Sequence, residues 1–184
     1  AHAVRGIQTG APGEDRIRPI LNYYNPTGST RFVHGQTSRE TYPTRHSHVN
    51  AVVVDSGWEG RAGKVLDDLA EEGHVVSWVK NAFLDFRIPY VDQAGKERDY
   101  YPDFILRASP PGAPPVQLIV EVTGMKKDKP EKVWAVVNRW LPAVNAIHQQ
   151  RGWPRWAFLE LDEELEIADA RNRVLKQLRA TDAA

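Results

Sequence analysis

The sequence predicts a mixed α/β fold, because segments with helical periodicity alternate with short β-favouring runs. Residues 100–107 and 116–122 are two apolar runs of strand length, joined by a loop rich in Pro and Gly. Residues 56–73 place their apolar side chains on one helical stripe, and a second amphipathic helix begins near Pro130. At 184 residues, the chain is about one domain long and can bury a sizeable core. We therefore expect strands and helices packed into one α/β unit.

The residues before this unit are expected to be rich in β-strand. Residues 1–15 have the small, polar composition of a linker. Residues 16–24 and 30–34 have the composition of two strands, and the segment between them contains the Pro and Gly of a hairpin turn. Residues 46–55 are predicted to form a further strand.

The first helix is expected to begin at Ser56, because Ser56 and Glu59 have the spacing of a capping box. Gly73 is expected to end it. Two short strand-like pieces follow, at residues 75–79 and 83–88, and then a turn that contains Gly. Together with the two apolar runs, these pieces predict a meander of strands.

The second long helix must be kinked or split at Pro142, which lacks an N–H and clashes with the preceding turn. A last strand at residues 156–161 and a closing helix at residues 164–178 complete the order α-β-β-β-β-α-β-α. We assign residues 1–55 to an N-terminal β-rich extension and residues 56–184 to the main domain.

Each of the two apolar runs contains one carboxylate where a hydrophobic residue is expected. Asp103 interrupts the first run, and Glu121 interrupts the second. A carboxylate in a buried strand is costly to desolvate unless a cation pairs with it. Two carboxylates on neighbouring strands indicate a shared cation, and a divalent metal is the simplest candidate. The alternative for Asp103 is a turn residue at a strand entry, since Pro-Asp is common in turns.

The composition limits the kind of site and the location. The chain has no cysteine, so it forms neither a disulfide framework nor a thiolate metal site, and a hard ion bound by oxygen is favoured over zinc. His46 and His48 share one strand face at a metal-binding spacing, but polar alternation on a strand explains them better. No apolar run approaches the ~20 residues of a membrane span, and the start lacks the features of a signal peptide. We expect a cytoplasmic protein without a membrane partner.

Charge is unevenly distributed, although the net charge is zero. Seven Lys and Arg residues lie between Val122 and Trp156, directly after Glu121. This basic segment is placed to contact phosphates, and the alternative is a solvated helix face. Four tryptophans are candidates for stacking on bases, although we expect at least half of them in the core: Trp134, Trp140, Trp153 and Trp156.

Several longer phrases accompany the Pro-Asp and the Glu in the same order. They are Asp55-Ser-Gly-Trp-Glu59, Val79-Lys-Asn81, Ile88-Pro-Tyr90, Tyr101-Pro-Asp-Phe-Ile105, Ile119-Val-Glu-Val-Thr-Gly124 and Trp140-Leu-Pro-Ala-Val-Asn145. This set resembles the C-terminal endonuclease domain of type III restriction enzyme Res (helicase-nuclease) subunits, in the PD-(D/E)xK nuclease superfamily. Residues 18–55 are similar to the segment that joins helicase and nuclease in those proteins. The resemblance implies a restriction-endonuclease-like core, a mixed central sheet flanked by helices, with an N-terminal β extension.

The resemblance also implies a magnesium site, with Mn²⁺ as a substitute ion. Asp103 and Glu121 would bind the metal, and the carbonyl of Val122 would be a further ligand. Glu59 matches an acidic residue that often contributes from the first helix, and its alternative role is the capping box. The lysine of the family motif would fall at Thr123, which can hydrogen-bond a water or a phosphate oxygen but brings no charge.

A lysine from a nearby position is expected to replace the one missing at Thr123. Lys126 and Lys129 are the first candidates, and Lys132 and Lys80 are two others. Such a lysine would polarise the attacking water or hold the phosphate. The alternative for the lysine cluster after Gly124 is a solvated helix entrance.

The function implied by the resemblance is a site-specific deoxyribonuclease that hydrolyses double-stranded DNA in a restriction system. No Walker lysine loop occurs in the sequence, so the ATP-driven motor is not in these residues. The resemblance implies that a helicase lies upstream in a longer polypeptide and that a methyltransferase subunit is the partner. One alternative is a catalytically silent module of the same fold that binds DNA or partner subunits, as Thr123 suggests. A second alternative is a sugar hydrolase with Asp103 and Glu121 as an acid/base pair.

Overall fold

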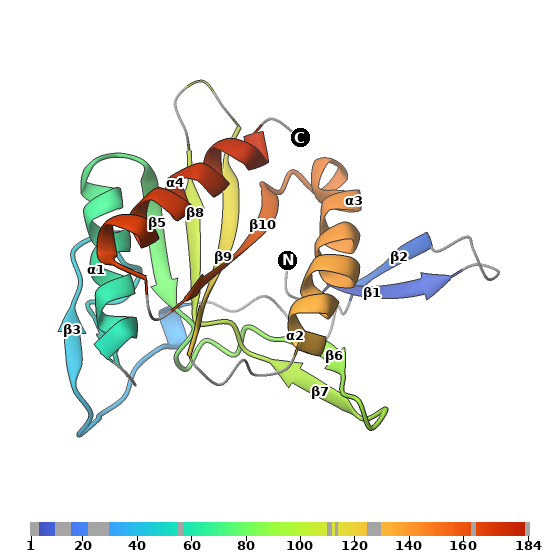
Figure 1. Ribbon diagram of the computed structural model, residues 1–184, viewed down its shortest axis with the longest axis horizontal. Helices are drawn as coiled ribbons and strands as arrows, with labels where there is room; N and C mark the ends of the chain where they lie inside the picture. The colour runs from blue at the N-terminus through green and yellow to red at the C-terminus, as the bar shows by residue number, and fades with distance from the viewer. Residues whose placement is uncertain are drawn as a thin grey trace.

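The computed structural model describes residues 4–9, 16–21, 30–54, 57–109, 112, 114–124, 130–162 and 165–182. Its centre is a four-stranded sheet formed by β5 (Val75–Lys80), β8 (Phe104–Ala108), β9 (Val116–Thr123) and β10 (Arg155–Asp162) (Figure 1). The strands lie in the order β10-β9-β8-β5. β9 and β10 are parallel, whereas β8 is antiparallel to both of its neighbours. The predicted mixed α/β class with a mixed central sheet is confirmed.

Helices cover both faces of the sheet. One face packs against α1 (Gly57–Glu71) and α4 (Ile167–Asp182). The other packs against α2 (Pro130–Ala135), the π-helical segment η2 (Val136–Trp140) and α3 (Leu141–Arg151). None of the described helices is long and apolar enough to cross a membrane.

Three two-stranded hairpins lie around this core. They pair β1 (Val4–Thr9) with β2 (Arg16–Leu21), β3 (Thr41–Pro43) with β4 (Ala51–Val53), and β6 (Ile88–Val91) with β7 (Glu97–Tyr100). A short 3-10 turn, η1 (Thr30–Phe32), follows the first hairpin along the chain. The first hairpin contacts α3, and the β6–β7 hairpin contacts α2 through β6.

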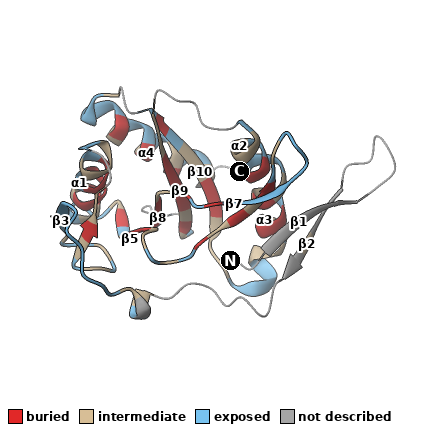
Figure 2. Ribbon diagram, turned by 90° about the horizontal axis from the view of Figure 1, so that it is seen from below, coloured by how far each residue is buried: buried red, intermediate tan, exposed pale blue. Residues whose placement is uncertain are grey.

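Side-chain alternation along the strands divides the buried residues into two cores. Leu118 and Val120 of β9 belong to the core under α1 and α4, whereas Ile119 belongs to the core under η2 and α3. In Figure 2 the buried residues follow the central strands and the inner faces of the helices. The second core is aromatic, with the ring centroids of Trp140 and Trp156 only 5.1 Å apart. This packing holds the end of β9 between two helical layers.

The order predicted from residue 56 onward is largely confirmed. Gly73 and Gly152 follow α1 and α3 with φ values of +81° and +64°, as expected for glycines that end helices. The predicted cap at Ser56 lies outside the described residues. The run predicted over residues 100–107 is divided, because Tyr100 ends β7 and β8 begins only at Phe104.

Several N-terminal predictions are wrong. Residues 1–15 are not simply a linker, because they contain β1, which is the hairpin partner of β2. Residues 30–34 do not form a strand and instead begin with the turn η1. Of residues 46–54, the described part of the strand predicted over residues 46–55, only the three residues of β4 are in a strand, and they pair with β3. β-Propensity identifies segments that can pair, but it does not identify the partner.

Residues 81–87 form an irregular loop in place of most of the strand predicted over residues 83–88. Phe83 and Asp85 have left-handed φ values of +60° and +56°. A strand cannot include such residues, so the apolar composition of this segment was a misleading signal. The strand β6 begins only at Ile88, where the backbone becomes extended.

The interruption predicted at Pro142 is confirmed, and it takes the form of the π-helical segment η2. The N–H of Leu141 bonds to the carbonyl of Val136, five residues earlier. Pro142 then falls in the first turn of α3, where its missing N–H leaves no helical bond unmade.

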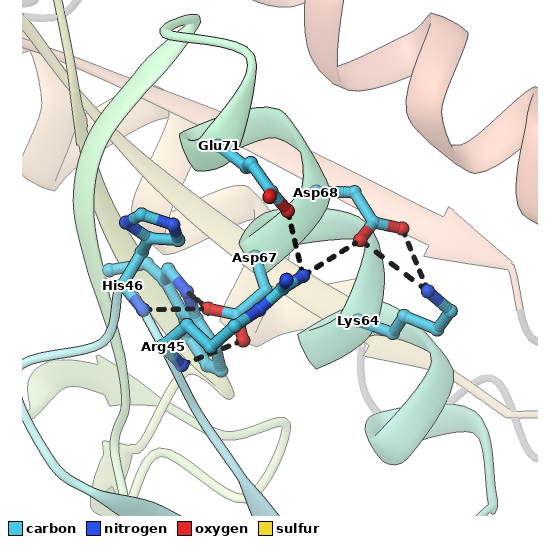
Figure 3. A network of polar contacts seen from close by, with 7 residues as sticks. Arg45, His46, Lys64, Asp67, Asp68 and Glu71 are labelled. Carbon is cyan, nitrogen blue, oxygen red and sulfur yellow. Dashed lines mark hydrogen bonds and ion pairs between the residues drawn. The ribbon is translucent and has the colours of Figure 1, made fainter.

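A buried carboxylate fixes the segment before β4 to α1 and β5 (Figure 3). Asp67 of α1 is fully buried, and its Oδ1 accepts hydrogen bonds from the Trp78 indole at 2.8 Å and from the backbone N–H of His46 at 3.1 Å. Its Oδ2 accepts the backbone N–H of Arg45 at 3.0 Å. Asp68, one residue further on, forms surface ion pairs with Lys64 and Arg45. Asp67 therefore has a structural role that the helical stripe did not indicate.

We expect Asp67→Ala to lower the free energy of unfolding by about 2–4 kcal/mol, because three donors in a buried setting lose a charged acceptor. Urea unfolding followed by circular dichroism measures this change. The matched control is Asp68→Ala, which removes exposed ion pairs and should cost less than about 1 kcal/mol. Equal losses in the two variants would contradict the role assigned to Asp67.

Candidate active site

Four residues form one row across one end of the central sheet. The antiparallel register pairs Lys80 with Phe104 and Phe104 with Val120, so the next row sets Asp103 beside Glu121. The backbone N–H of Asn81 donates to the carbonyl of Asp103 at 2.8 Å and continues the row toward β5. Glu160 of β10 pairs with Glu121 and completes it. The two predicted carboxylates are thus neighbours on adjacent strands.

The carboxylate of Asp103 is held by the backbone of β9. Its Oδ2 accepts the N–H of Val122 at 2.7 Å. Burial and the charge of Glu121 raise the pKa of Asp103 to about 7, although the hydrogen bond from Val122 opposes this shift. The proximity of a second carboxylate therefore makes ionisation of Asp103 costly, and a cation at this point would offset that cost.

Glu121 is only 5% exposed and has a partner for each of its carboxylate oxygens. The hydroxyl of Tyr100 donates to Oε2 at 2.6 Å, and the ammonium of Lys132 donates to Oε1 at 2.6 Å. Burial and the charge of Glu121 raise the pKa of Tyr100, so its hydroxyl stays protonated and remains a donor. The Lys132 ammonium also lies 5.0 Å above the Tyr100 ring. These contacts fix the orientation of Glu121.

Glu59 lies at the start of α1 and forms an ion pair with a buried lysine. The Nζ of Lys80 is 2.7 Å from Oε2 of Glu59 and 2.7 Å from the carbonyl oxygen of Val53. Lys80 is 6% exposed, so its charge is largely removed from water. The charges of Glu59 and Lys80 also act on Asp103, the first raising and the second lowering its pKa. The structure therefore brings Glu59 close to the Asp103–Glu121 pair.

Of the four lysines considered as replacements for the one missing at Thr123, two lie in the described part of the chain. Thr123 contacts Glu160, with Oγ1 donating to Oε1 at 3.3 Å. Lys126 and Lys129, the preferred candidates, lie outside the described residues. Of the other two candidates, Lys132 contacts Glu121 directly, whereas Lys80 contacts Glu59. The spacing of residues along the sequence does not show which lysine a helix will turn toward the strands.

Two residues of this site were missed by the sequence interpretation. In the sequence, Tyr100 has the features of an ordinary aromatic residue in a strand. Its position shortly before Pro102-Asp103 was the one indication that it belongs to the site. Glu160 interrupts an apolar run, as Asp103 and Glu121 do, and the same reasoning applied to residues 156–161 would have found it. Tyr100 donates to Glu121, and Glu160 is the register partner of Glu121 on β10.

The donor set fits a hard divalent ion with few protein ligands. Asp103 and Glu121 offer carboxylate oxygens, and Mg²⁺ commonly takes one or two carboxylates and keeps several waters. Within the described part of the chain, no three His, Cys, Asp or Glu side chains gather into a larger ligand group. His46 and His48 lie before β4 and not on a strand, so the shared strand face expected for them does not form; His48 contacts the Ser77 hydroxyl at 3.0 Å. The carboxylate pair is therefore the strongest candidate for a metal among the described residues.

The basic segment and the tryptophans divide between the core and the surface. Trp140 and Trp156 are buried in the aromatic core, as expected for half of the set. Trp153 packs at the edge of that core, whereas Trp134 is half exposed, with the Arg139 guanidinium 4.9 Å above its ring. Of the basic residues in the described part of this segment, Lys132 reaches the carboxylate row.

The raised pKa of Asp103 predicts a pH dependence of stability. Between about pH 4 and pH 7, the folded protein keeps a proton on Asp103 that the unfolded chain has released, so this group lowers stability as the pH rises. Asp103→Asn removes the effect. The measurement is the free energy of unfolding in urea without divalent ions. From pH 4 to pH 8, this free energy should rise in the variant by at least about 1.4 kcal/mol relative to the unmodified protein. Parallel pH profiles for the two proteins would contradict the shift.

Comparison with known proteins adds no relative to this geometry. No model of a protein family matches the chain, and no match was found among curated proteins or among solved structures.

Proposed function

We propose that this protein is a magnesium-dependent endonuclease domain of the PD-(D/E)xK type that hydrolyses phosphodiester bonds of double-stranded DNA. The observation that carries the proposal is the pair of carboxylates, Asp103 and Glu121, on adjacent strands, with the Lys132 ammonium 2.6 Å from Glu121. A phosphodiesterase of this kind needs a metal held by carboxylates and a cation near the phosphate. The two carboxylates that would hold the metal are neighbours in one row of the sheet, and Lys132 reaches that row from α2.

The arrangement of the elements supports the same proposal. Apart from the β6–β7 hairpin, the order around the sheet is helix, three antiparallel strands, helix and a fourth strand parallel to the third. This is the order that the resemblance implies for a restriction-endonuclease-like core. The carboxylates lie where the first and third strands end and the second begins.

The residues of the site would divide the work as follows. Asp103 and Glu121 would hold Mg²⁺ or Mn²⁺, with the Val122 carbonyl as a further ligand, and the metal would supply charge neutralisation and an acidified water. Tyr100 fixes the rotamer of Glu121 through its hydroxyl. Lys132 would contact the attacking water or a phosphate oxygen, in place of the lysine missing at Thr123.

The wider setting follows from the resemblance. The proposed protein is part of a type III restriction system, with an ATP-driven helicase region upstream in the same polypeptide and a methyltransferase subunit as partner. In that setting, the cytoplasm is the expected location. Glu59, which Lys80 holds near Asp103, would tune the charge of the metal site from α1.

A second candidate is a silent module that keeps the fold and binds DNA or partner subunits without cutting. The contacts of Glu121 favour it, because Tyr100 and Lys132 already satisfy both carboxylate oxygens without a metal. In this case the Lys132–Glu121 ion pair would be purely structural. The two candidates differ in whether a divalent ion binds at Asp103.

For the nuclease, we expect nicking of supercoiled plasmid DNA with Mg²⁺ or Mn²⁺, and a fall of at least about 100-fold in Asp103→Asn and in Glu121→Gln. An agarose-gel time course measures the rate. Asp68→Asn, which changes an acidic residue on the outer side of α1, is the matched control and should keep full activity.

Isothermal titration with Mn²⁺ separates the two candidates. The nuclease should bind the ion in a manner that Asp103→Asn abolishes. If the unmodified protein does not nick the plasmid and shows no Mn²⁺ binding that depends on Asp103, the silent module is favoured. Equal nicking by the protein and both variants would mean a contaminating nuclease.

Lys132→Ala is expected to lower the maximal cleavage rate about 100-fold or more, because it removes the cation placed at Glu121. Mn²⁺ binding in this variant should persist or strengthen, since a competing positive charge is gone. Lys132→Arg should recover part of the rate. Lys64→Ala, which removes an exposed lysine of α1, provides the control. A larger effect of Lys126→Ala or Lys129→Ala than of Lys132→Ala would assign the role elsewhere.

A further inference from the structure

The loop after β5, residues 81–87, begins beside the carboxylate row, and the side chain of its first residue, Asn81, binds the backbone near its end. Asn81 donates its backbone N–H to the carbonyl of Asp103 at 2.8 Å. Its side-chain Nδ2 donates to the carbonyl of Phe86 at 2.7 Å, and its Oδ1 accepts the N–H of Phe86 at 3.1 Å. Asn81 therefore joins the two ends of the segment 81–86 to each other and joins its first residue to the backbone of Asp103.

The far end of this loop is anchored in the aromatic core. The buried Phe86 ring stacks on Trp156 with centroids 5.7 Å apart, and it meets the edge of Trp140 at 5.9 Å. Anchors at both ends leave the intervening residues little freedom to rearrange. The loop is thus a preformed feature of the fold.

The loop presents an aromatic ring to solvent at the cost of backbone strain. Phe83 has a φ of +60° and is 73% exposed, more than any other large apolar side chain in the described residues. Asp85 has a similar left-handed φ of +56°. Bulky residues rarely adopt this conformation, and it persists where surrounding structure imposes it, often at binding sites. Burial does not explain the orientation of Phe83, because its side chain lies in water.

A second exposed aromatic residue, Tyr101, lies near the other partner of the hydrogen bond between Asn81 and Asp103. Tyr101 is 49% exposed and lies between Tyr100, which binds Glu121, and Pro102, which precedes Asp103. Phe83 and Tyr101 are each two residues away from a partner of the Asn81–Asp103 hydrogen bond. Two residues of chain span at most about 7 Å, so the backbones of Phe83 and Tyr101 lie within that reach of the hydrogen-bonded pair Asn81 and Asp103.

We propose that Phe83 and Tyr101 stack on bases of an unpaired DNA strand whose phosphate lies at Asp103 and Glu121. Aromatic side chains bind single strands by stacking on the faces of bases, which are covered by neighbouring pairs inside a duplex. The substrate at the point of cleavage is therefore a locally opened strand. This inference rests on the proposed function for the identity of the ligand as nucleic acid, and it goes further by specifying the state of the bases.

Fluorescence anisotropy with a fluorescein-labelled single strand and with the matching duplex tests this proposal on the whole chain, without a divalent ion. We expect tighter binding of the single strand, and a loss of about 5- to 100-fold for Phe83→Ala and for Tyr101→Ala. Phe83→Tyr should restore binding because it keeps a stacking ring. Circular dichroism checks that each variant is folded.

Two exposed residues away from the loop provide matched controls. Val76, 55% exposed on β5, and Ile167, 42% exposed on α4, should give little change on substitution by Ala. The proposal is overturned if the duplex and the single strand bind equally, or if Ile167→Ala costs as much as Phe83→Ala. Phe83-dependent binding of the single strand without any cleavage would instead refute the nuclease and leave the stacking role intact.

Discussion

The antiparallel pairing of β8 with β9 is the constraint on which the candidate site depends. Its register places the carboxyl group of Asp103, which is partly buried, beside the buried carboxylate of Glu121. The rest of the site compensates for that arrangement: a backbone N–H binds Asp103, and a phenol and an ammonium bind Glu121. Since an unpaired buried charge is costly, these contacts have to form together with the sheet. The repulsion that remains is what a divalent ion would relieve.

The site is also a meeting point of elements that are distant in the sequence. α1 contributes Glu59, β5 contributes Lys80, and α2 contributes Lys132. Each of these lysines lies against one carboxylate, Lys80 against Glu59 and Lys132 against Glu121. A site of this kind is an ion-pair network, and under the proposed function it would also hold a metal. That double character explains why the nuclease and the silent module remain two distinct candidates for the same geometry.

Much of this could be predicted from the sequence, because the informative signals were local. The apolar stripe of α1, the runs of β8 and β9 and the two carboxylates depend on spacing along the chain. The errors concern partners: β1 was missed as the partner of β2, and Phe83 was assigned to a strand on composition alone. Lys132 was one of four possible lysines, since helix rotation and loop length decide which one reaches Glu121. Such choices are made by tertiary packing, which a single sequence does not display.

The π-helical segment η2 sets how α2 and α3 are rotated relative to each other about the helix axis. Each helical residue advances about 100° around the axis, so the wider π turn changes the phase of everything that follows. α2 can thus direct Lys132 at Glu121 while Trp140 and α3 keep their own contacts with the aromatic core. Because of η2, the rotation of α2 about the helix axis, which directs Lys132, is independent of the rotation of α3, which packs against the core. Related chains could shift a lysine from the strand to the helix without rebuilding the core.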